Sequence, residues 1–372
     1  MTPSAPSGQR VVVRELAEDP DEAVARLAVE PMSPPPATEL GPRDVLIAVE
    51  SAAVGWVDLL MTSGQYQHAP RPPYTPGLEY AGRVAWRGDE AAARVAVGDD
   101  VMADGLLTGP RSRGAHQRWG GFATWAVAPV EAVLPRPRAL SADQAAGLLS
   151  SYETAYHCLV TRGRVQAGET VLVHGASGAT GLAAVHVAKL LGATVIATGR
   201  SADKLAIVKA EGADHVIEVG DVGSEEGVTA LREQVRAVTG GRGADVVHDG
   251  VGGPISVASL RCVRFGARYL IVGWAATPGV ARGKGGRGAP NANVLPTNLI
   301  MMKGLDVLGC PMVIATGEDP SLRPPRLAQV LAWVEEGRLR PRVGRVYPLS
   351  EARTALRAKW RGEVVGGIVV RP

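Results

Sequence analysis

A glycine-rich segment is the part of the sequence whose residue types point most directly to chemistry. It follows the apolar run Thr170–His174 and precedes a run predicted to be helical, Leu182–Leu191. Glycine lets the backbone turn tightly and approach a phosphate without a Cβ in the way, and the N-terminus of a helix offers free N–H groups and a positive dipole end. The segment therefore predicts a loop that binds the pyrophosphate of a dinucleotide, with contacts from Gly175, Ser177, Gly178, Ala179, Thr180 and Gly181.

The end of the next predicted strand, Thr194–Thr198, bears on which nicotinamide cofactor is bound. An acidic residue there would accept hydrogen bonds from the ribose 2′-OH and repel a 2′-phosphate. The sequence instead has Gly199, Arg200 and Ser201, with Lys204 one turn later. Together these groups could hold a 2′-phosphate through charge-assisted hydrogen bonds. NADPH is predicted, and the alternative is that Arg200 and Lys204 merely cover the solvated start of a helix.

The elements that would position these residues alternate between strand and helix from Thr170 to Val272. Continuous apolar strands in this rhythm are typical of a doubly wound parallel sheet of the Rossmann type. Up to about residue 138, short β-branched runs between Pro and Gly residues predict a compact β domain. Ser141, with Gln144 at the capping-box position, opens a predicted helix that extends to about Leu159.

Bulk properties limit the function classes. The 372 residues exceed what one core usually serves, which predicts two domains. The net charge of +3 and the 4% aromatic content argue against nucleic acid as a partner. Three scattered cysteines, no signal-peptide pattern and no membrane-spanning run favour a cytoplasmic protein that acts on a small molecule.

Several stretches resemble the quinone oxidoreductase and enoyl reductase branch of the zinc-independent medium-chain dehydrogenase/reductases. The stretch from Pro76 to Val84 resembles the Pro-Gly-x-Glu-x-x-Gly-x-Val signature, and Gly120–Trp125 and Tyr347–Leu349 with Ala352 match further patterns. The resemblance implies a Rossmann domain inserted in a GroES-like, mostly-β catalytic domain, with the active site between them. The expected boundaries are 1–150 and 300–372 for the catalytic domain and 151–299 for the NADPH-binding domain. It also implies a homodimer that pairs Leu305–Gly309.

The resemblance also bears on metal chemistry. Zinc-dependent relatives carry a His in the signature where this chain has Leu78, and the four-cysteine lobe is missing. Without Cys and His ligands there is no Lewis acid, so no metal is expected. Reduction of a quinone or of a conjugated C=C is then favoured over zinc-type alcohol dehydrogenation.

The run from Asp58 to Tyr66 resembles the Asp, Gly and Tyr spacing of quinone and enoyl reductases. The resemblance implies that Tyr66 delivers a proton, and the alternative is an ordinary loop tyrosine. Gly55 replaces the family's Asn, and Leu60 replaces a Tyr, which suggests a larger or more apolar acceptor pocket. Its predicted lining is Trp56, Leu60 and Tyr152.

Further cofactor contacts are expected around the nicotinamide. Thr154 matches a family position beside it, and the predicted fourth and fifth strands end where a switch-point crevice would place it. The additional predicted contacts are Val251, Val272, Gly273, Trp274 and Asn298. Two basic loops, 111–118 and 282–287, are expected either to attract an anionic acceptor or to be solvated.

The sequence thus predicts an NADPH-dependent oxidoreductase that transfers hydride to an enone, an enoyl thioester or a quinone without zinc. Two alternatives stay open: a non-catalytic NADPH-binding protein and a zinc-free carbonyl reductase.

Overall fold

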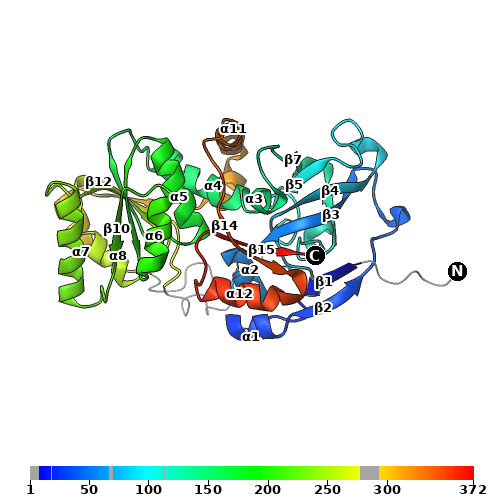
Figure 1. The fold of residues 1–372 in the computed structure, drawn as a ribbon, viewed down its shortest axis with the longest axis horizontal. Coiled ribbons are helices and arrows are strands. Elements are labelled where there is room, and N and C mark those ends of the chain that lie inside the picture. Colours follow the sequence, from blue (N-terminus) through cyan, green and yellow to red (C-terminus); the bar gives the residue numbers. More distant parts are fainter. Residues whose placement is uncertain (1–7, 18, 67–69, 113, 277–292) are drawn as a thin grey trace. The chain divides into compact units, whose positions relative to one another are not determined.

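The computed structural model describes residues 8–17, 19–66, 70–112, 114–276 and 293–372 (Figure 1). The chain forms two compact units. The first runs to Ser150 and takes in Arg340–Pro372, and the second holds the described residues between Ser151 and Leu339. The stretch from 300 to 339, expected in the catalytic domain, thus lies in the second unit, because its strand extends the sheet of that unit.

A mostly antiparallel sheet forms the centre of the first unit. Its strand order is β14 (Val343–Pro348), β15 (Gly367–Arg371), β3 (Asp44–Ala53), β4 (Tyr80–Arg87), β5 (Asp100–Ala103) and β7 (Val133–Pro135), with β6 (Trp125–Pro129) also pairing with β3. A separate hairpin joins β1 (Gly8–Val12) to β2 (Ala28–Met32). The helices are α1 (Pro20–Ala25), α2 (Trp56–Thr62), α3 (Ala142–Ala146) and α12 (Ala352–Trp360). Alternate side chains of β3, among them Val45, Ile47 and Val49, are buried in the core of this unit.

The second unit contains a six-stranded sheet in which every pair is parallel. Its order is β10 (His215–Glu218), β9 (Thr194–Gly199), β8 (Thr170–Val173), β11 (Ala244–Asp249), β12 (Val263–Ile271) and β13 (Asp306–Gly309). All four residues of β8 and all six of β11 are buried, as expected for central strands of a covered parallel sheet. The predicted doubly wound sheet is confirmed.

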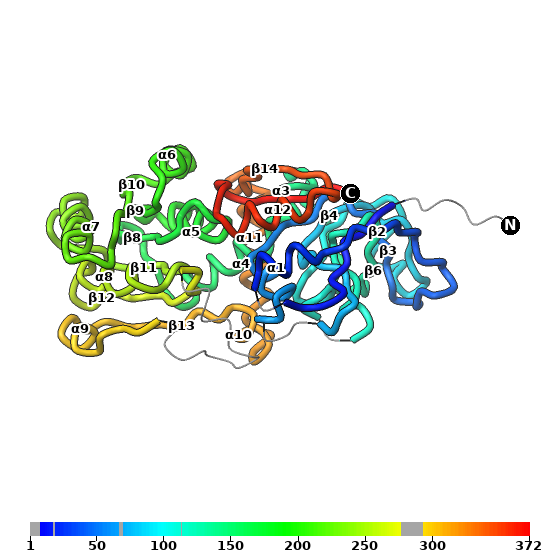
Figure 2. The backbone as a smooth tube through the Cα atoms, turned by 90° about the horizontal axis from the view of Figure 1, so that it is seen from below, coloured from blue at the N-terminus to red at the C-terminus, as the bar shows by residue number. Residues whose placement is uncertain are grey.

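The helices of this unit are α4 (Leu149–Tyr156), α5 (Ala179–Leu190), α6 (Ala202–Ala210), α7 (Glu225–Val238), α8 (Pro254–Ser259), α9 (Thr297–Lys303), α10 (Met312–Glu318) and α11 (Arg323–Glu335). Helices α5 and α6 lie against β8, β9 and β10, and α7 packs against α8 (Figure 2). No helix in the described ranges is long and apolar enough to cross a membrane.

The predicted single helix from Ser141 to Leu159 is divided. Its start is confirmed: Ser141 Oγ accepts a hydrogen bond from Gln144 N at 3.3 Å, and Gln144 Oε1 accepts one from Ser141 N at 3.2 Å. Gly147 then ends α3, and α4 begins at Leu149 and continues into a π-helical turn, His157–Arg162. The helix is interrupted at Gly147 because glycine has a low helix propensity.

Candidate functional site

The predicted phosphate loop lies between β8 and α5 in the second unit. Gly175 has a φ of +62°, which glycine adopts without strain. A Cβ on Gly181 would lie 2.2 Å from the carbonyl oxygen of Gly175, so the loop and the first helical turn pack with no room for a side chain. Gly178 is the N-cap of α5, and within the described residues no side chain caps this helix start. The amide groups of Ala179, Thr180 and Gly181 are therefore available to an anion.

His174 fixes the end of β8 just before this loop. Its Nδ1 lies 2.8 Å from Thr198 Oγ1 and its Nε2 lies 2.6 Å from Ser259 Oγ. Burial lowers the pKa of His174, and its ring lies between the two hydroxyl groups. Sequence reasoning placed His174 in the strand and missed this role.

The loop after β11 lies beside the phosphate loop, because β8 and β11 are neighbours whose connections leave in opposite directions. A Cβ on Gly175 would come within 2.9 Å of Val251 Cγ2. Asp249 shapes this second loop by accepting hydrogen bonds from the N–H groups of Val251 and Gly252 at 2.8 and 2.9 Å. Ligands of doubly wound sheets bind at such a switch point.

Asp249 stays ionised although it is buried. Burial would raise its pKa, but His174 and hydrogen bonds from Ser256, Tyr269 and Gly252 together lower it below the usual range. Ser256 Oγ and Tyr269 OH each donate to Asp249 Oδ2 at 2.5 Å. The carboxylate therefore acts as a rigid anchor for the segment that carries Val251.

The segment after β12 runs alongside the loop after β11. Val272 N and Gly273 N both donate to Asp249 O, and Ala276 N donates to Val251 O at 2.7 Å. The structure thus brings Val251, Val272 and Gly273 together near the phosphate loop. Trp274 continues this segment and is 47% exposed.

The predicted 2′-phosphate contacts also gather at one place. Strand β9 ends at Gly199, Arg200 is exposed, and Ser201 is the N-cap of α6, accepting a hydrogen bond from Lys204 N at 3.4 Å. A guanidinium, a hydroxyl and an ammonium group therefore stand around the start of one helix, which suits a phosphate monoester.

Thr154 is half-buried on α4, and its neighbours hold that helix firmly. Glu153 is buried and accepts hydrogen bonds from Arg326 Nε at 2.9 Å and from Arg323 Nη2 at 3.1 Å. The Tyr152 hydroxyl lies 2.8 Å from His186 Nδ1, and His186 Nε2 lies 3.2 Å from Glu211 Oε2. Tyr152, predicted to line the acceptor pocket, is 3% exposed, and its hydroxyl is engaged by His186.

Asn298 is exposed on α9. The same helix ends with Lys303, whose Nζ donates to Val263 O at the start of β12. That contact places the end of α9 at the edge of the sheet opposite to the carboxyl ends of the strands.

In the first unit, Tyr66 follows α2 and is half-buried. Its N–H donates to the carbonyl of Leu60 at 3.1 Å, so these two predicted site residues are neighbours. Helix α2 is fixed by Asp58, which accepts from Gly55 N at 2.8 Å and from Gly77 N at 3.0 Å. Burial raises the pKa of Asp58 to about 6.

Trp56, the first residue of α2, lies against α12. Its ring stacks on Trp360, with centroids 5.3 Å apart and planes at 24°. Both rings are half-buried at the edge of the core of the first unit. Trp360 was not among the residues predicted from the sequence.

The residues at the position of a zinc site do not fit a metal. Leu78 is 4% exposed and apolar. Beside it, Glu79 accepts a hydrogen bond from Ser150 N, and burial raises its pKa to about 7. Among the residues that the structure describes, no three His, Cys, Asp or Glu side chains converge on one point.

The basic loop 111–118 is solvated only in part. Arg111 is buried, and its Nε donates to Gly105 O at 3.0 Å. Its positive charge opposes the rise that burial causes in the pKa values of Asp58 and Glu79. Arg118 is exposed and lies over the Trp119 ring, 5.1 Å from its centroid. The second basic loop, 282–287, and Arg113 lie outside the described residues.

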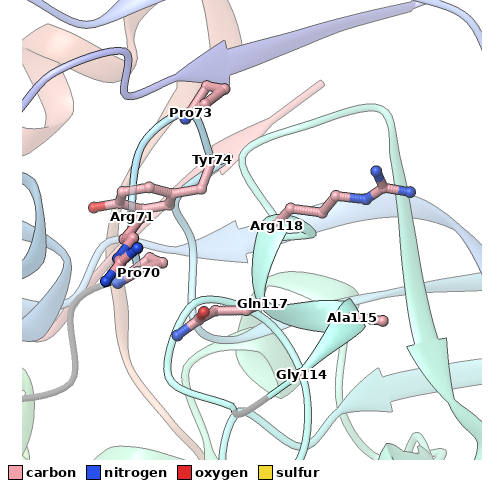
Figure 3. Close-up of a pocket in the computed structure, with 8 residues that line it drawn as sticks. All are labelled: Pro70, Arg71, Pro73, Tyr74, Gly114, Ala115, Gln117 and Arg118. Atoms are coloured by element: carbon pink, nitrogen blue, oxygen red, sulfur yellow. The ribbon is translucent and has the colours of Figure 1, made fainter.

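A cavity of about 430 Å³ lies in the first unit between the segments 70–74 and 114–118. Figure 3 shows Pro70, Arg71 and the Tyr74 ring on one side and Arg118 on the other. Tyr74 is 3% exposed, and its hydroxyl has no hydrogen-bond partner among the described residues. The cavity begins four residues after Tyr66 in the chain and has a basic residue on each of these two sides.

Comparison with known proteins identifies both parts of the chain. The family model described as "Alcohol dehydrogenase GroES-like domain" matches residues 41–138, and the one described as "Zinc-binding dehydrogenase" matches residues 179–332. Quinone oxidoreductase-like protein 2 of Bos taurus is 32% identical over 330 residues, covering 88% of this chain and 84% of its own. Quinone oxidoreductase of Homo sapiens is 30% identical over 316 residues, 84% of this chain and 85% of its own.

Solved structures agree with these matches. The mycobacterial protein Rv1454c in complex with NADPH superposes with a TM-score of 0.77 at 27% identity, covering 98% of this chain and all of that one. The CurK enoyl reductase has the same fold, with a TM-score of 0.75 at 21% identity over 98% of this chain and 99% of its own. The predicted combination of a GroES-like domain and a Rossmann-type sheet is confirmed.

Proposed function

We propose, from the premise that the chain belongs to the quinone oxidoreductase branch of the medium-chain dehydrogenase/reductase superfamily, that it is an NADPH-dependent reductase of conjugated acceptors. Its acceptor would be a quinone or the C=C of an enone or enoyl thioester. The protein is an oxidoreductase by family, and the cofactor, the acceptor class and the absence of zinc are the proposed parts.

The observation that carries the proposal is the arrangement of two loops at the switch point between β8 and β11. The amide groups at the start of α5 suit a pyrophosphate, and the anchored loop of Val251 borders the same crevice. Arg200, Ser201 and Lys204 suit a 2′-phosphate, and none of the three residues from Gly199 to Ser201 is acidic, as a residue that selects NADH would be.

Bound NADPH supplies the hydride, and the chain must orient the acceptor and provide a proton. Tyr66 is the proposed proton donor, supported by its half-buried position beside Leu60. Leu60 and the Trp56–Trp360 pair would give an acceptor apolar surface rather than polar contacts. Zinc plays no part in this scheme, because apolar Leu78 stands where a ligand would be needed.

The test is NADPH oxidation measured with a panel of quinones, α,β-unsaturated ketones and enoyl-CoA thioesters, with NADH and a metal chelator in parallel. We expect turnover with one acceptor class, a preference for NADPH and no effect of the chelator. Tyr66→Phe should lower kcat about 10²-fold, the contribution typical of a positioned proton donor, while cofactor affinity is unchanged. Tyr347→Phe, which removes a hydroxyl that accepts a hydrogen bond from Arg345 at 3.1 Å, is the matched control and should keep full activity.

Other outcomes select the alternatives. Tight NADPH binding with no turnover of any acceptor would favour a non-catalytic NADPH-binding protein. Turnover confined to simple ketones would favour a carbonyl reductase, and full activity of Tyr66→Phe would exclude Tyr66 as the donor.

The homodimer is also proposed through β13, the edge strand of the six-stranded sheet. An unpaired strand edge presents N–H and C=O groups that a second copy could pair. Sedimentation of the 38.7 kDa chain at twice its mass would support this assembly, and a monomer at micromolar concentration would contradict it.

A further inference from the structure

Two of the three buried cysteines lie together in the second unit. Cys158 is in the π-helical turn His157–Arg162, and Cys310 directly follows β13. Although 152 positions separate them in the chain, their side chains share a hydrogen bond. Cys262 has a different neighbour, because its Sγ donates to Ala258 O at 3.4 Å within its own turn.

Backbone contacts hold the two thiols in place. Arg162 lies one helical turn after Cys158, on the same side, and its Nε donates to the carbonyl of Gly309 at 3.0 Å. On the other side, Cys310 N donates to Ile271 O at 3.0 Å, which fixes this residue to the end of β12. Both cysteines are therefore carried by ordered segments, with side-chain exposures of 0% and 4%.

The charges around the pair make the two thiols unequal. The hydrogen bond from Cys158 and the Arg162 guanidinium lower the pKa of Cys310, although burial opposes them. The same hydrogen bond and burial raise the pKa of Cys158. Cys310 is thus the thiol that ionises first, and Cys158 stays protonated beside it.

We propose that Cys158 and Cys310 form a reversible disulfide when the protein meets hydrogen peroxide. The Cys310 thiolate attacks one peroxide oxygen, the O–O bond breaks, and hydroxide leaves with formation of a sulfenic acid on Cys310. The Cys158 sulfur then attacks that sulfur, the S–S bond forms and the S–O bond breaks, releasing water. In sum, two thiols and one peroxide give one disulfide and two waters, and a dithiol reductant restores both thiols.

The experiment exposes the folded full-length chain to hydrogen peroxide, blocks remaining thiols in denaturant, and maps cysteine-containing peptides by mass spectrometry. We expect a Cys158–Cys310 cross-linked peptide, lighter by two hydrogens than the reduced pair and lost with dithiothreitol. Cys262 should remain free in the same sample. Peptides that show both thiols free, or disulfides that involve Cys262, would overturn the proposal.

Variants separate the two steps. Cys262→Ser is the matched control and should form the cross-link at the wild-type rate. Cys158→Ser should stop at the sulfenic acid, which dimedone traps on Cys310, whereas Cys310→Ser should lose Cys158 thiol at least ten times more slowly. Equal oxidation rates in both variants would refute the assigned order. If either variant fails to fold, the wild-type peptide map still decides whether the bond forms.

Discussion

Glu79 is a carboxyl group enclosed in the first unit beside Asp58 and Arg111. Its backbone partner, Ser150 N, and the Arg111 charge favour the ionised form, but burial outweighs them and raises its pKa from 4.5 to about 7. The folded state therefore retains a proton that the unfolded chain has already released between these two pH values. Folding stability from this residue is present below the unfolded pKa and is lost as pH rises through the folded one.

Glu79→Gln should remove this pH dependence. The shift corresponds to about 3 kcal/mol, at 1.36 kcal/mol for each pKa unit. Relative to the wild type, the variant should gain unfolding free energy between pH 5 and pH 8, measured by denaturant titration. Glu351→Gln, at an exposed carboxyl of the same unit, is the control. If the difference in unfolding free energy between variant and wild type does not change with pH, Glu79 is not the titrating group.

Arg200 is the residue on which the choice of cofactor is expected to depend most. Arg200→Glu should raise the KM for NADPH at least tenfold and leave the KM for NADH within a factor of two, because a charge-assisted hydrogen bond contributes about 1.5–3 kcal/mol. Lys209→Glu, at the far end of α6, makes the same charge change on an exposed residue. If the KM for NADPH rises equally in the two variants, the overall charge of the protein is responsible and Arg200 has no specific role.

Single residues were predictable where the backbone alone decides the role. Glycine types and spacing predicted the tight turn between β8 and α5, where Gly175 has a positive φ and Gly181 packs against the carbonyl oxygen of Gly175. The roles of Arg111 and Tyr152 were not predictable. Their side chains are engaged by Gly105 and His186, and such contacts depend on tertiary packing rather than on local pattern.

Two glycines in the turn from β8 into α5 differ in the space available for a side chain. A Cβ on Gly181 would meet the Gly175 carbonyl at 2.2 Å, whereas a Cβ on Gly178 would lie 3.5 Å from the same oxygen, an ordinary contact. Gly181→Ala should therefore lower the unfolding free energy by roughly 1–3 kcal/mol and weaken NADPH binding at least tenfold. Gly178→Ala should bind NADPH nearly as the wild type does. Calorimetric titration with NADPH measures the affinity of both variants. A similar loss of NADPH affinity in the two variants would contradict the prediction.

Elements were predicted best where their end signals are local. The Ser141 cap was found because its partner Gln144 is three residues away. The division of the helix at Gly147 and the π-helical turn after Tyr156 were missed, since the apolar pattern continues through both. Tertiary contacts, such as those of Glu153 with α11, settle the course of the chain there.

The first unit is completed by a strand from the far end of the chain. Strand β15 lies between β14 and β3, and Arg371 pairs with Asp143. Deleting residues 367–372 should prevent the first unit from folding while the parallel sheet of the second unit persists. Circular dichroism and limited proteolysis would then show a protected fragment within 151–339 only. Deletion of Pro372 alone is the control, and a protected first unit in the longer deletion would refute the expectation.

The sequence predicted two domains and the return of the chain to the first, but it placed that return near residue 300 instead of 340. The reason lies in β13. Four residues of ordinary strand composition can join either sheet, and only the pairing with β12 decides between them.

The position of β15 also has a consequence for how the protein is made. Strand β3 ends at residue 53 and β15 begins at residue 367, so a ribosome adding 5–20 residues per second needs roughly 15–60 s between them. During that interval the second unit emerges in full, while the edge of β3 that β15 will cover remains open. A nascent chain in this state presents an unpaired strand to other chains. Slow translation would prolong this exposure, and chaperones that shield β edges would matter most for the domain synthesised first.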